Sequence, residues 1–261
     1  MIGVVTISFN QARYLQRAID SVRVASAGLP VKYVVVDGNS TDGSKEIINQ
    51  NRNHISRTII EPDRGPSDAL NKGFAICNDC EIFYYLNADD VVAEDAFRYA
   101  TDFFAERPNI DILFGAIRII DSEDHAFLRA RVPDRFSLSR YAIGASNIFQ
   151  QGTFFRKSAF SRTDGFNLTN RTCWDGELAV DMILRGASFE RIRKVLGYFR
   201  IHGESITGSG KLNMVFEKDK ERLRNKIEAA GFVIPSATRA KILTTCYKFN
   251  PRSHLEYLAA R

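Results

Sequence analysis

Two adjacent acidic residues are the clearest candidates for chemistry in this chain. Asp89 and Asp90 follow an apolar, aromatic-rich run at 81–86 that has the composition of a buried strand. Two carboxylates at such a strand end can share one divalent cation, because hard oxygen ligands suit Mg²⁺ or Mn²⁺. The alternative is a turn that caps a following helix at 93–104. These residues alone leave both interpretations open.

Several other kinds of chemistry lack their residues. No G-x-G-x-x-G follows the first apolar run, which disfavours NAD or FAD binding. The Gly-rich segment 207–211 does not match the phosphate-binding motif G-x-x-x-x-G-K-[ST]. Ser205 stands where the motif needs its first glycine, and Leu212 stands where it needs the metal-binding hydroxyl. Cys77 and Cys80 have no second pair at zinc spacing, and the four histidines form no H-E-x-x-H. The carboxylates therefore remain the best lead.

The acids lie in a regular alternation of strand-like and helix-like segments. Short apolar runs alternate with runs of helical period, which predicts a mainly parallel sheet with helices on both faces, an α/β fold. The predicted strands are 2–7, 33–36, 57–60 and 81–86, and the predicted helices are 12–24, 44–51 and 67–76.

Polar residues follow each predicted strand. The strand ends carry the segments 8–10, 37–39, 61–64 and 87–90. Ligands of open α/β sheets bind outside the carboxyl ends of the strands. We therefore expect these segments to converge on one edge and to form the site.

The alternation loosens in the second half of the chain. Predicted strands at 110–120, 150–155, 188–193 and 197–201 and a helix at 175–184 indicate a mixed part of the sheet. With no repeat or linker, we expect one domain at 1–210, with halves 1–105 and 106–210. A helical C-terminal extension is expected at 211–261.

Charge and composition suggest a soluble protein of a reducing compartment. The net charge is +5, but residues 1–210 hold 25 basic and 26 acidic residues, whereas 211–261 hold 11 and 5. The basic excess thus belongs to the extension, which removes the main support for a nucleic-acid partner. The four cysteines are too few for a disulfide framework. Without a signal peptide or a spanning apolar run, a cytoplasmic location is expected.

Four linked motifs closely resemble the family 2 glycosyltransferases of GT-A fold. They are Thr6-Ile-Ser8-Phe-Asn10, Asp37-Gly-Asn-Ser-Thr-Asp-Gly43, Asp63-Arg64-Gly65-Pro66-Ser67-Asp68-Ala-Leu-Asn71-Lys-Gly73 and Asn87-Ala-Asp89-Asp90. Their order, spacing and strand-end placement match over 1–105. The resemblance implies a Rossmann-like sheet, a nucleotide-diphosphate sugar donor, and transfer with inversion at the anomeric carbon.

Three segments of the second half resemble the family less closely. Gln151–Arg156 is similar to its strand near the acceptor, and the segment 173–178 to the one that carries its catalytic base. The segment 199–206 is similar to an Arg-x-His element that closes over the diphosphate. Residues 208–261 show no resemblance.

The resemblance also implies a set of nucleotide-binding residues. Asp37 would accept hydrogen bonds from the base or ribose, Asp68 and Asn71 would line the base, and Asn87 would contact ribose or sugar hydroxyls. The whole set is Thr6, Ser8, Asn10, Asp37, Arg64, Asp68, Asn71 and Asn87. The alternative for each is a cap or turn role, as for Asp68 in the first turn of a helix.

The metal would be Mn²⁺ or Mg²⁺, bound by Asp89, Asp90 and His202. Asn87 stands where the family's D-x-D has its first Asp, which removes one charge from the expected metal site. A structural role for His202 is the alternative.

Inversion by one displacement needs a base opposite the leaving group. Asp175 is the expected base and Glu177 the second choice, although Asp175 could simply cap its helix. Trp174, the single tryptophan, would stack on an acceptor sugar or pack in the core.

The resemblance favours a UDP-sugar donor and a saccharide or lipid-linked acceptor, as in bacterial surface polysaccharide synthesis. Two alternatives remain: a sugar-1-phosphate nucleotidyltransferase, weakened by the lack of glycine in Ser8–Ala12, and a non-catalytic nucleotide-sugar binding module. The basic segment 211–261 could hold the protein against the anionic inner face of a membrane, or form a solvated helix face.

Overall fold

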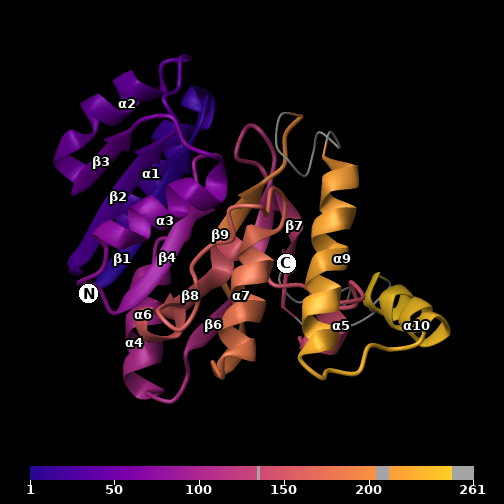
Figure 1. The fold of residues 1–261 in the computed structure, drawn as a ribbon. Coiled ribbons are helices and arrows are strands. Elements are labelled where there is room, and N and C mark those ends of the chain that lie inside the picture. Colours follow the sequence, from indigo (N-terminus) through magenta and orange to yellow (C-terminus); the bar gives the residue numbers. More distant parts are fainter. Residues whose placement is uncertain (134–135, 204–211, 249–261) are drawn as a thin grey trace.

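A computed structural model describes residues 1–133, 136–203 and 212–248, and Figure 1 shows its sheet flanked by helices. The strand order is β3-β2-β1-β4-β8-β6-β9-β5, with β7 paired to β6. The predicted segments 204–206 and 207–211 and the tail 249–261 lie outside the described residues.

The first half is a parallel sheet, as the sequence predicts. Neighbouring strands β3, β2, β1 and β4 all pair in parallel. The strands are β1 Ile2–Ser8, β2 Val31–Asp37, β3 Arg57–Ile60 and β4 Ile82–Asn87, and the helices are α1 Ala12–Ala25, α2 Ser44–Gln50 and α3 Pro66–Ile76. A short 3₁₀ turn, η1 Arg52–His54, precedes β3.

Apolar side chains cover both faces of this sheet, which is why its strands are continuous apolar runs. Val4 packs into a core layer with α1, whereas Val5, on the opposite face, packs with α3. A Cβ on Gly73 would lie 2.4 Å from a methyl carbon of Val5. Glycine at this position therefore lets α3 approach β1 closely.

The second half is mixed. Strands β6 Ile112–Ile120 and β9 Phe189–Arg200 pair in parallel, whereas β5 Val91–Val92, β7 Ala126–Arg131 and β8 Thr153–Arg156 run antiparallel to their neighbours. The helices are α4 Ala96–Glu106, α5 Leu138–Tyr141, α6 Lys157–Phe160 and α7 Trp174–Leu184.

Two predicted boundaries in this half are wrong. The separate strands expected at 188–193 and 197–201 are one strand, β9, which absorbs two register shifts against β6 between Phe114 and Ile117. The strand expected at 150–155 begins only at Thr153, because Gln150–Gly152 forms a 3₁₀ turn, η2.

Two helices follow the sheet. Leu223 and Ile227 of α9 Asn213–Ala229 are buried in the same core layer as α3 and α7. The last described helix, α10 Ala237–Lys248, projects from the rest of the molecule in Figure 1. Among the described residues, no helix combines the length and apolar character needed to cross a membrane.

Candidate active site

The register of the parallel strands brings the predicted site residues to one edge. Ser8 of β1 pairs with Asp37 of β2, and Ile7 pairs with Asn87 of β4. The loops that follow these strands therefore start side by side. The sheet positions the acidic turn beside the ends of β1 and β2, whose motifs we predicted to bind a nucleotide.

The loops after β1 and β2 are tied together by Asp37. Its fully buried carboxylate accepts hydrogen bonds from the Ser40 backbone N–H and from the Ser40 hydroxyl, both at 2.7 Å. The Ser40 hydroxyl oxygen accepts one from the Asn10 N–H at 2.8 Å. The Asn10 side chain in turn accepts one from the Thr41 N–H at 2.9 Å. This network fixes the shape of the two loops.

Thr6 and Ser8, which both lie on β1, have different environments. The Thr6 hydroxyl is fully buried and accepts a hydrogen bond from the Tyr33 hydroxyl at 3.0 Å. The Ser8 hydroxyl, at the strand end, has no partner among the described residues. The Ser8 hydroxyl therefore remains able to hydrogen-bond a ligand at the site, whereas the Thr6 hydroxyl is already hydrogen-bonded in the core.

Asp68 organises the loop before α3. It accepts hydrogen bonds from the Arg64 backbone N–H and guanidinium, both at 3.1 Å, and contacts Lys72 at 3.3 Å. Burial raises the pKa of Asp68, but these partners outweigh burial and lower it below its usual value. Most of the Arg64 side chain stays exposed and can reach a ligand.

Asn71 connects the two halves of the chain. Its amide nitrogen donates to the Phe166 carbonyl at 2.8 Å, and its amide oxygen accepts from the Phe166 N–H at 2.9 Å. The side-chain amide therefore holds the segment that precedes α7 against α3.

The acidic turn after β4 contains one inward and one outward carboxylate. Asp90 is 1% exposed and accepts hydrogen bonds from the Arg200 N–H at 2.9 Å, Gln151 Nε2 at 2.7 Å and Asn87 Nδ2 at 3.3 Å. Burial, together with the nearby charge of Asp89, raises the pKa of Asp90 well above its usual range. Asp89 instead contacts His202, with its Oδ2 3.0 Å from Nε2.

Arg200 supports this turn from inside the protein. The guanidinium donates to the carbonyl of Asp89 at 2.8 Å and to that of Asp121 at 2.7 Å, and it pairs with Asp124. It also stacks on the Tyr14 ring, 4.8 Å from its centre. The buried Arg200 thus braces the turn, and His202 lies beside Asp89. The expected place of this Arg-x-His segment over a diphosphate stays a prediction.

The residues of the turn fit a divalent cation with few protein ligands. The described residues contain no group of three His, Cys, Asp or Glu side chains that could hold a metal. Asp89 and His202, whose side chains meet at 3.0 Å, would supply two ligand atoms, and the buried Asn87 Oδ1 has no partner among the described residues. A cation that takes its other ligands from phosphates and water matches this set.

Asp175 lies at the start of α7 among aromatic residues. Burial raises the pKa of its carboxyl, and hydrogen bonds from the N–H groups of Gly176 and Asp175 offset only part of that rise. Burial and the Asp175 charge raise the pKa values of Tyr85 and Tyr141. A Cβ on Gly176 would lie 1.8 Å from the Tyr141 hydroxyl, so glycine admits this ring. Among the described residues, no cation forms an ion pair with Asp175.

Glu177, two residues later, is locked in its charged form. It accepts hydrogen bonds from Asn170, Asn167, Arg222 and Lys226 at 2.7–3.0 Å. Although burial opposes ionisation, Arg222 leads the partners that lower the pKa of Glu177 to about 2. A carboxylate with so low a pKa is a poor proton acceptor at neutral pH.

Trp174, the residue expected to contact an acceptor, is 8% exposed and packs in the core layer that contains α7.

Gln151, which holds Asp90, was not proposed as a site residue from sequence. Its place as the first residue of the matched segment Gln151–Arg156 is the signal that could have found it.

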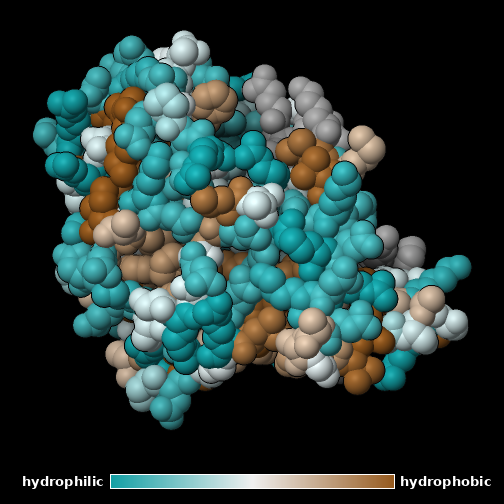
Figure 2. Space-filling model, viewed as in Figure 1, coloured by the Kyte–Doolittle hydropathy of each residue, from teal (hydrophilic) through white to brown (hydrophobic). Residues whose placement is uncertain are grey.

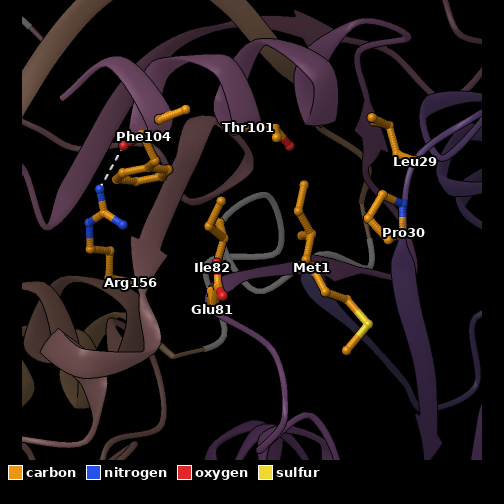
Figure 3. Close-up of a pocket in the computed structure, with 10 residues that line it drawn as sticks. Met1, Leu29, Pro30, Glu81, Ile82, Thr101, Phe104 and Arg156 are labelled. Atoms are coloured by element: carbon orange, nitrogen blue, oxygen red, sulfur yellow. Dashed lines mark hydrogen bonds between the residues drawn. The ribbon is translucent and has the colours of Figure 1, made fainter. Parts of the chain in front are cut away.

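A separate cavity lies at the other end of the strands. It has a volume of about 170 Å³ and is lined by residues such as Met1, Ile82 and Phe104 (Figure 3). Arg156 donates to the Phe104 carbonyl at 2.8 Å at its border. None of the predicted site residues lines this cavity.

Known proteins resemble this chain in sequence and in fold. Residues 3–164 match the model of glycosyl transferase family 2. An uncharacterized glycosyltransferase of Mycobacterium tuberculosis is 28% identical over 188 residues, which is 71% of this chain and 68% of that protein. The poly-beta-1,6-N-acetyl-D-glucosamine synthase of Staphylococcus epidermidis is 27% identical over 163 residues, 58% of this chain and 38% of that protein.

Solved structures share the fold. The structure of S. aureus TarS 1-349 with UDP has a TM-score of 0.65 at 17% identity, covering 94% of this chain and 70% of that one. The mannosyltransferase PcManGT of Pyrobaculum calidifontis, with GDP-Man and Mn²⁺, has a TM-score of 0.60 at 17% identity, covering 99% and 85%. The fold is the GT-A glycosyltransferase fold.

The low pKa of Glu177 predicts how stability depends on pH. Because the folded-state pKa of about 2 lies below the ordinary 4.5, Glu177 stabilises the fold above pH 4.5 and loses this effect as the pH falls. Between pH 5 and 3, wild type should lose about 2 kcal/mol more unfolding free energy than Glu177→Gln. Urea unfolding at both pH values measures the difference. The exposed Glu217→Gln is the control, and equal losses in wild type and Glu177→Gln would contradict the prediction.

Proposed function

Because this chain belongs to glycosyl transferase family 2, we propose that it moves a sugar from a nucleotide-diphosphate sugar to an acceptor hydroxyl, with inversion. The observation that carries the proposal is the edge where β1, β2 and β4 end, because the register places Ser8 beside Asp37 and Ile7 beside Asn87, with the acidic turn directly after Asn87. The charges of Asp175 and Asp90 both contribute to the raised pKa of Tyr85 on β4, which supports a base near this edge. A single displacement needs both a base and a leaving-group site at one centre.

The donor nucleotide would occupy the edge formed by β1, β2 and β4. The Ser8 hydroxyl, which has no partner in the part of the chain that the structure describes, supports this assignment. The exposed Arg64 guanidinium and the fixed loops around Asp37 also support it. Asn10, Asp68, Asn71 and Asn87 shape the same edge. The related folds were solved with UDP, UDP-GlcNAc and GDP-Man, and we favour a UDP-sugar.

A divalent cation, Mn²⁺ or Mg²⁺, would be held by Asp89 and His202. When bound, it supplies Lewis-acid stabilisation of the negative charge on the leaving diphosphate. Asp90 would contribute indirectly, because both of its oxygens already accept hydrogen bonds from the protein. Arg200 keeps the backbone of the turn in place through the Asp89 carbonyl.

Asp175 would act as the general base. As the acceptor oxygen bonds to the anomeric carbon, the bond from that carbon to the diphosphate oxygen breaks, and the acceptor proton passes to an Asp175 oxygen. A pKa raised by burial makes Asp175 a better proton acceptor than an exposed aspartate. Glu177, with a pKa of about 2, is the weaker candidate.

The acceptor would approach along α7, where Trp174 lies next to the base. The similarity to a poly-beta-1,6-N-acetyl-D-glucosamine synthase supports a saccharide acceptor, free or lipid-linked, in polysaccharide synthesis. Trp174 is mostly buried, so only a small part of its surface can contact a sugar.

Replacing Asp175 by Asn tests the base. Asparagine keeps the size of the side chain but cannot accept the proton, so transfer should fall by about 100- to 10,000-fold. Nucleotide affinity, measured by calorimetry, should stay at the wild-type value. The control is Asp164→Asn, at an exposed residue that pairs with Arg185. Undiminished transfer in Asp175→Asn would refute the assignment.

A thermal-shift screen tests the donor and the metal together. A nucleotide sugar at a hundredfold excess over its Kd should stabilise the protein by about 2.7 kcal/mol. Mn²⁺ should increase the shift in wild type but not in Asp89→Asn. Asp95→Asn, at an exposed pair with Lys194, should retain the increase. The proposal would be contradicted if Mn²⁺ still increased the thermal shift in Asp89→Asn, or if no nucleotide sugar shifted the unfolding temperature of wild type.

The C-terminal helices support a peripheral membrane contact. Phe232, Val233 and Ile242 are exposed, and no acidic residue occurs between Glu228 and Lys248. Figure 2 shows hydrophobic side chains where α9 meets α10, beside hydrophilic ones on α10. We propose that this apolar and basic surface rests on anionic lipid at the inner face of a membrane.

Vesicle sedimentation tests this contact. The protein should bind vesicles that contain anionic lipid and bind weakly to zwitterionic ones. The double change Arg239→Gln, Lys241→Gln should cost about 2 kcal/mol, or about 30-fold in affinity. The same change at Lys218 and Lys220 of α9 is the control. Absence of binding to anionic vesicles at every salt concentration would refute the contact.

A further inference from the structure

A cluster of charged side chains joins the base-bearing helix α7 to α9. Glu177 receives Arg222 Nη2 at 2.7 Å and Lys226 Nζ at 2.8 Å, and Lys226 also reaches Asp181 at 2.8 Å. Arg222 Nη1 contacts Asp219 at 2.7 Å. We call Glu177, Asp181, Asp219, Arg222 and Lys226 the α7–α9 charge cluster. Its cations come from a helix beyond the 3–164 match to the family model.

The same cluster holds the segment that leads into α7. Asp219 accepts hydrogen bonds from the Thr172 hydroxyl at 2.6 Å and the Arg171 N–H at 3.1 Å. Asn170 donates to Glu177 at 2.7 Å, and its side-chain oxygen accepts from the Cys173 N–H at 2.9 Å. The residues on both sides of Asp175 are thereby fixed.

Contacts extend from this segment to the donor side. The Arg171 guanidinium donates to the Arg64 carbonyl, and the Ser67 hydroxyl donates to the Asn170 carbonyl at 3.4 Å. Arg64 and Ser67 belong to the loop and first turn of α3 that we assign to the nucleotide. The segment 170–173 thus contacts both the loop before α3, which we assign to the donor nucleotide, and α7, which carries Asp175.

Asp175 and Glu177 point in different directions from the first turn of α7. Two residues apart on a helix are about 200° apart around its axis. Glu177 contacts α9, whereas Asp175 acts on Tyr85 and Tyr141. Charge pairs are a weak source of net stability compared with apolar packing, which Leu223 and Ile227 already supply. Their directional bonds are better suited to fixing an orientation.

We propose that Glu177, held by Arg222 and Lys226, is a positioning residue that fixes the rotation of the first turn of α7 and so aims Asp175 at the acceptor hydroxyl. The inference rests on the proposed function, because it takes Asp175 as the base. It makes α9 part of the catalytic unit. A misplacement of about 1 Å at a reacting group can cost about 100-fold in rate.

Kinetics of matched variants test the proposal. Glu177→Gln and Lys226→Met should lower kcat by about 10- to 100-fold. Their donor KM and the affinity and stoichiometry of nucleotide binding should remain those of wild type. Lys226→Arg, which retains the charge, should recover most of kcat. Glu217→Gln, on the exposed face of α9, should behave as wild type.

Each outcome decides the matter. A wild-type kcat in both Glu177→Gln and Lys226→Met would overturn the positioning role. Parallel losses of kcat and of nucleotide-binding stoichiometry would also overturn it, because they indicate unfolding. If Glu177→Gln does not fold, Lys226→Met with its Lys226→Arg rescue decides alone. Failure of the proposed function is seen separately, as wild-type transfer that Asp175→Asn leaves intact, or no transfer by wild type.

Discussion

The buried carboxylate of Asp90 is the constraint on which the site depends. A carboxyl group removed from water must find hydrogen-bond donors within the protein. Here the donors come from Asn87 at the end of β4, Gln151 before β8, and Arg200 at the end of β9. The hydrogen bonds to the Asp90 carboxylate therefore bring together the ends of β4 and β9 and the turn before β8. They join the parallel half of the sheet to the mixed half. Asp89 then stands at the edge of a turn that cannot shift freely.

Arg200 extends this constraint outward. Its guanidinium is buried, yet it binds the Asp89 carbonyl, the Asp121 carbonyl and Asp124, and it rests on Tyr14. A buried cation with this many partners is tolerated because its donors are used and its charge is balanced. The acidic turn, the hairpin between β6 and β7, and α1 thereby meet at one side chain. The Arg200 guanidinium therefore holds the backbone of the acidic turn from inside the protein.

The sequence predicted the parallel half well because its signals are local. Each strand is a short apolar run that ends in turn residues, as at Asp37 and Asn87, so both topology and site edge follow. The contacts that determine whether a residue supports the fold or faces the site are not local in sequence. Arg200 meets Asp90 across 110 residues, and Asn71 meets Phe166 across 95. Contacts at such sequence separations leave no periodic pattern in the sequence. The sequence of β9 predicts two strands because the register shifts against β6 interrupt its alternation.

The two acids of α7 show how surroundings assign chemistry to identical groups. Asp175 has no cation partner among the described residues, and burial raises the pKa of its carboxyl. Glu177 receives two cations from α9, and its pKa falls to about 2. Such a separation of pKa values is how neighbouring carboxyls take different roles. Two of the basic residues that make the C-terminal segment positive, Arg222 and Lys226, are thus engaged in ion pairs with α7. The exposed basic side chains that remain for an anionic surface include Lys218 and Arg224 on α9 and Arg239 and Lys241 on α10.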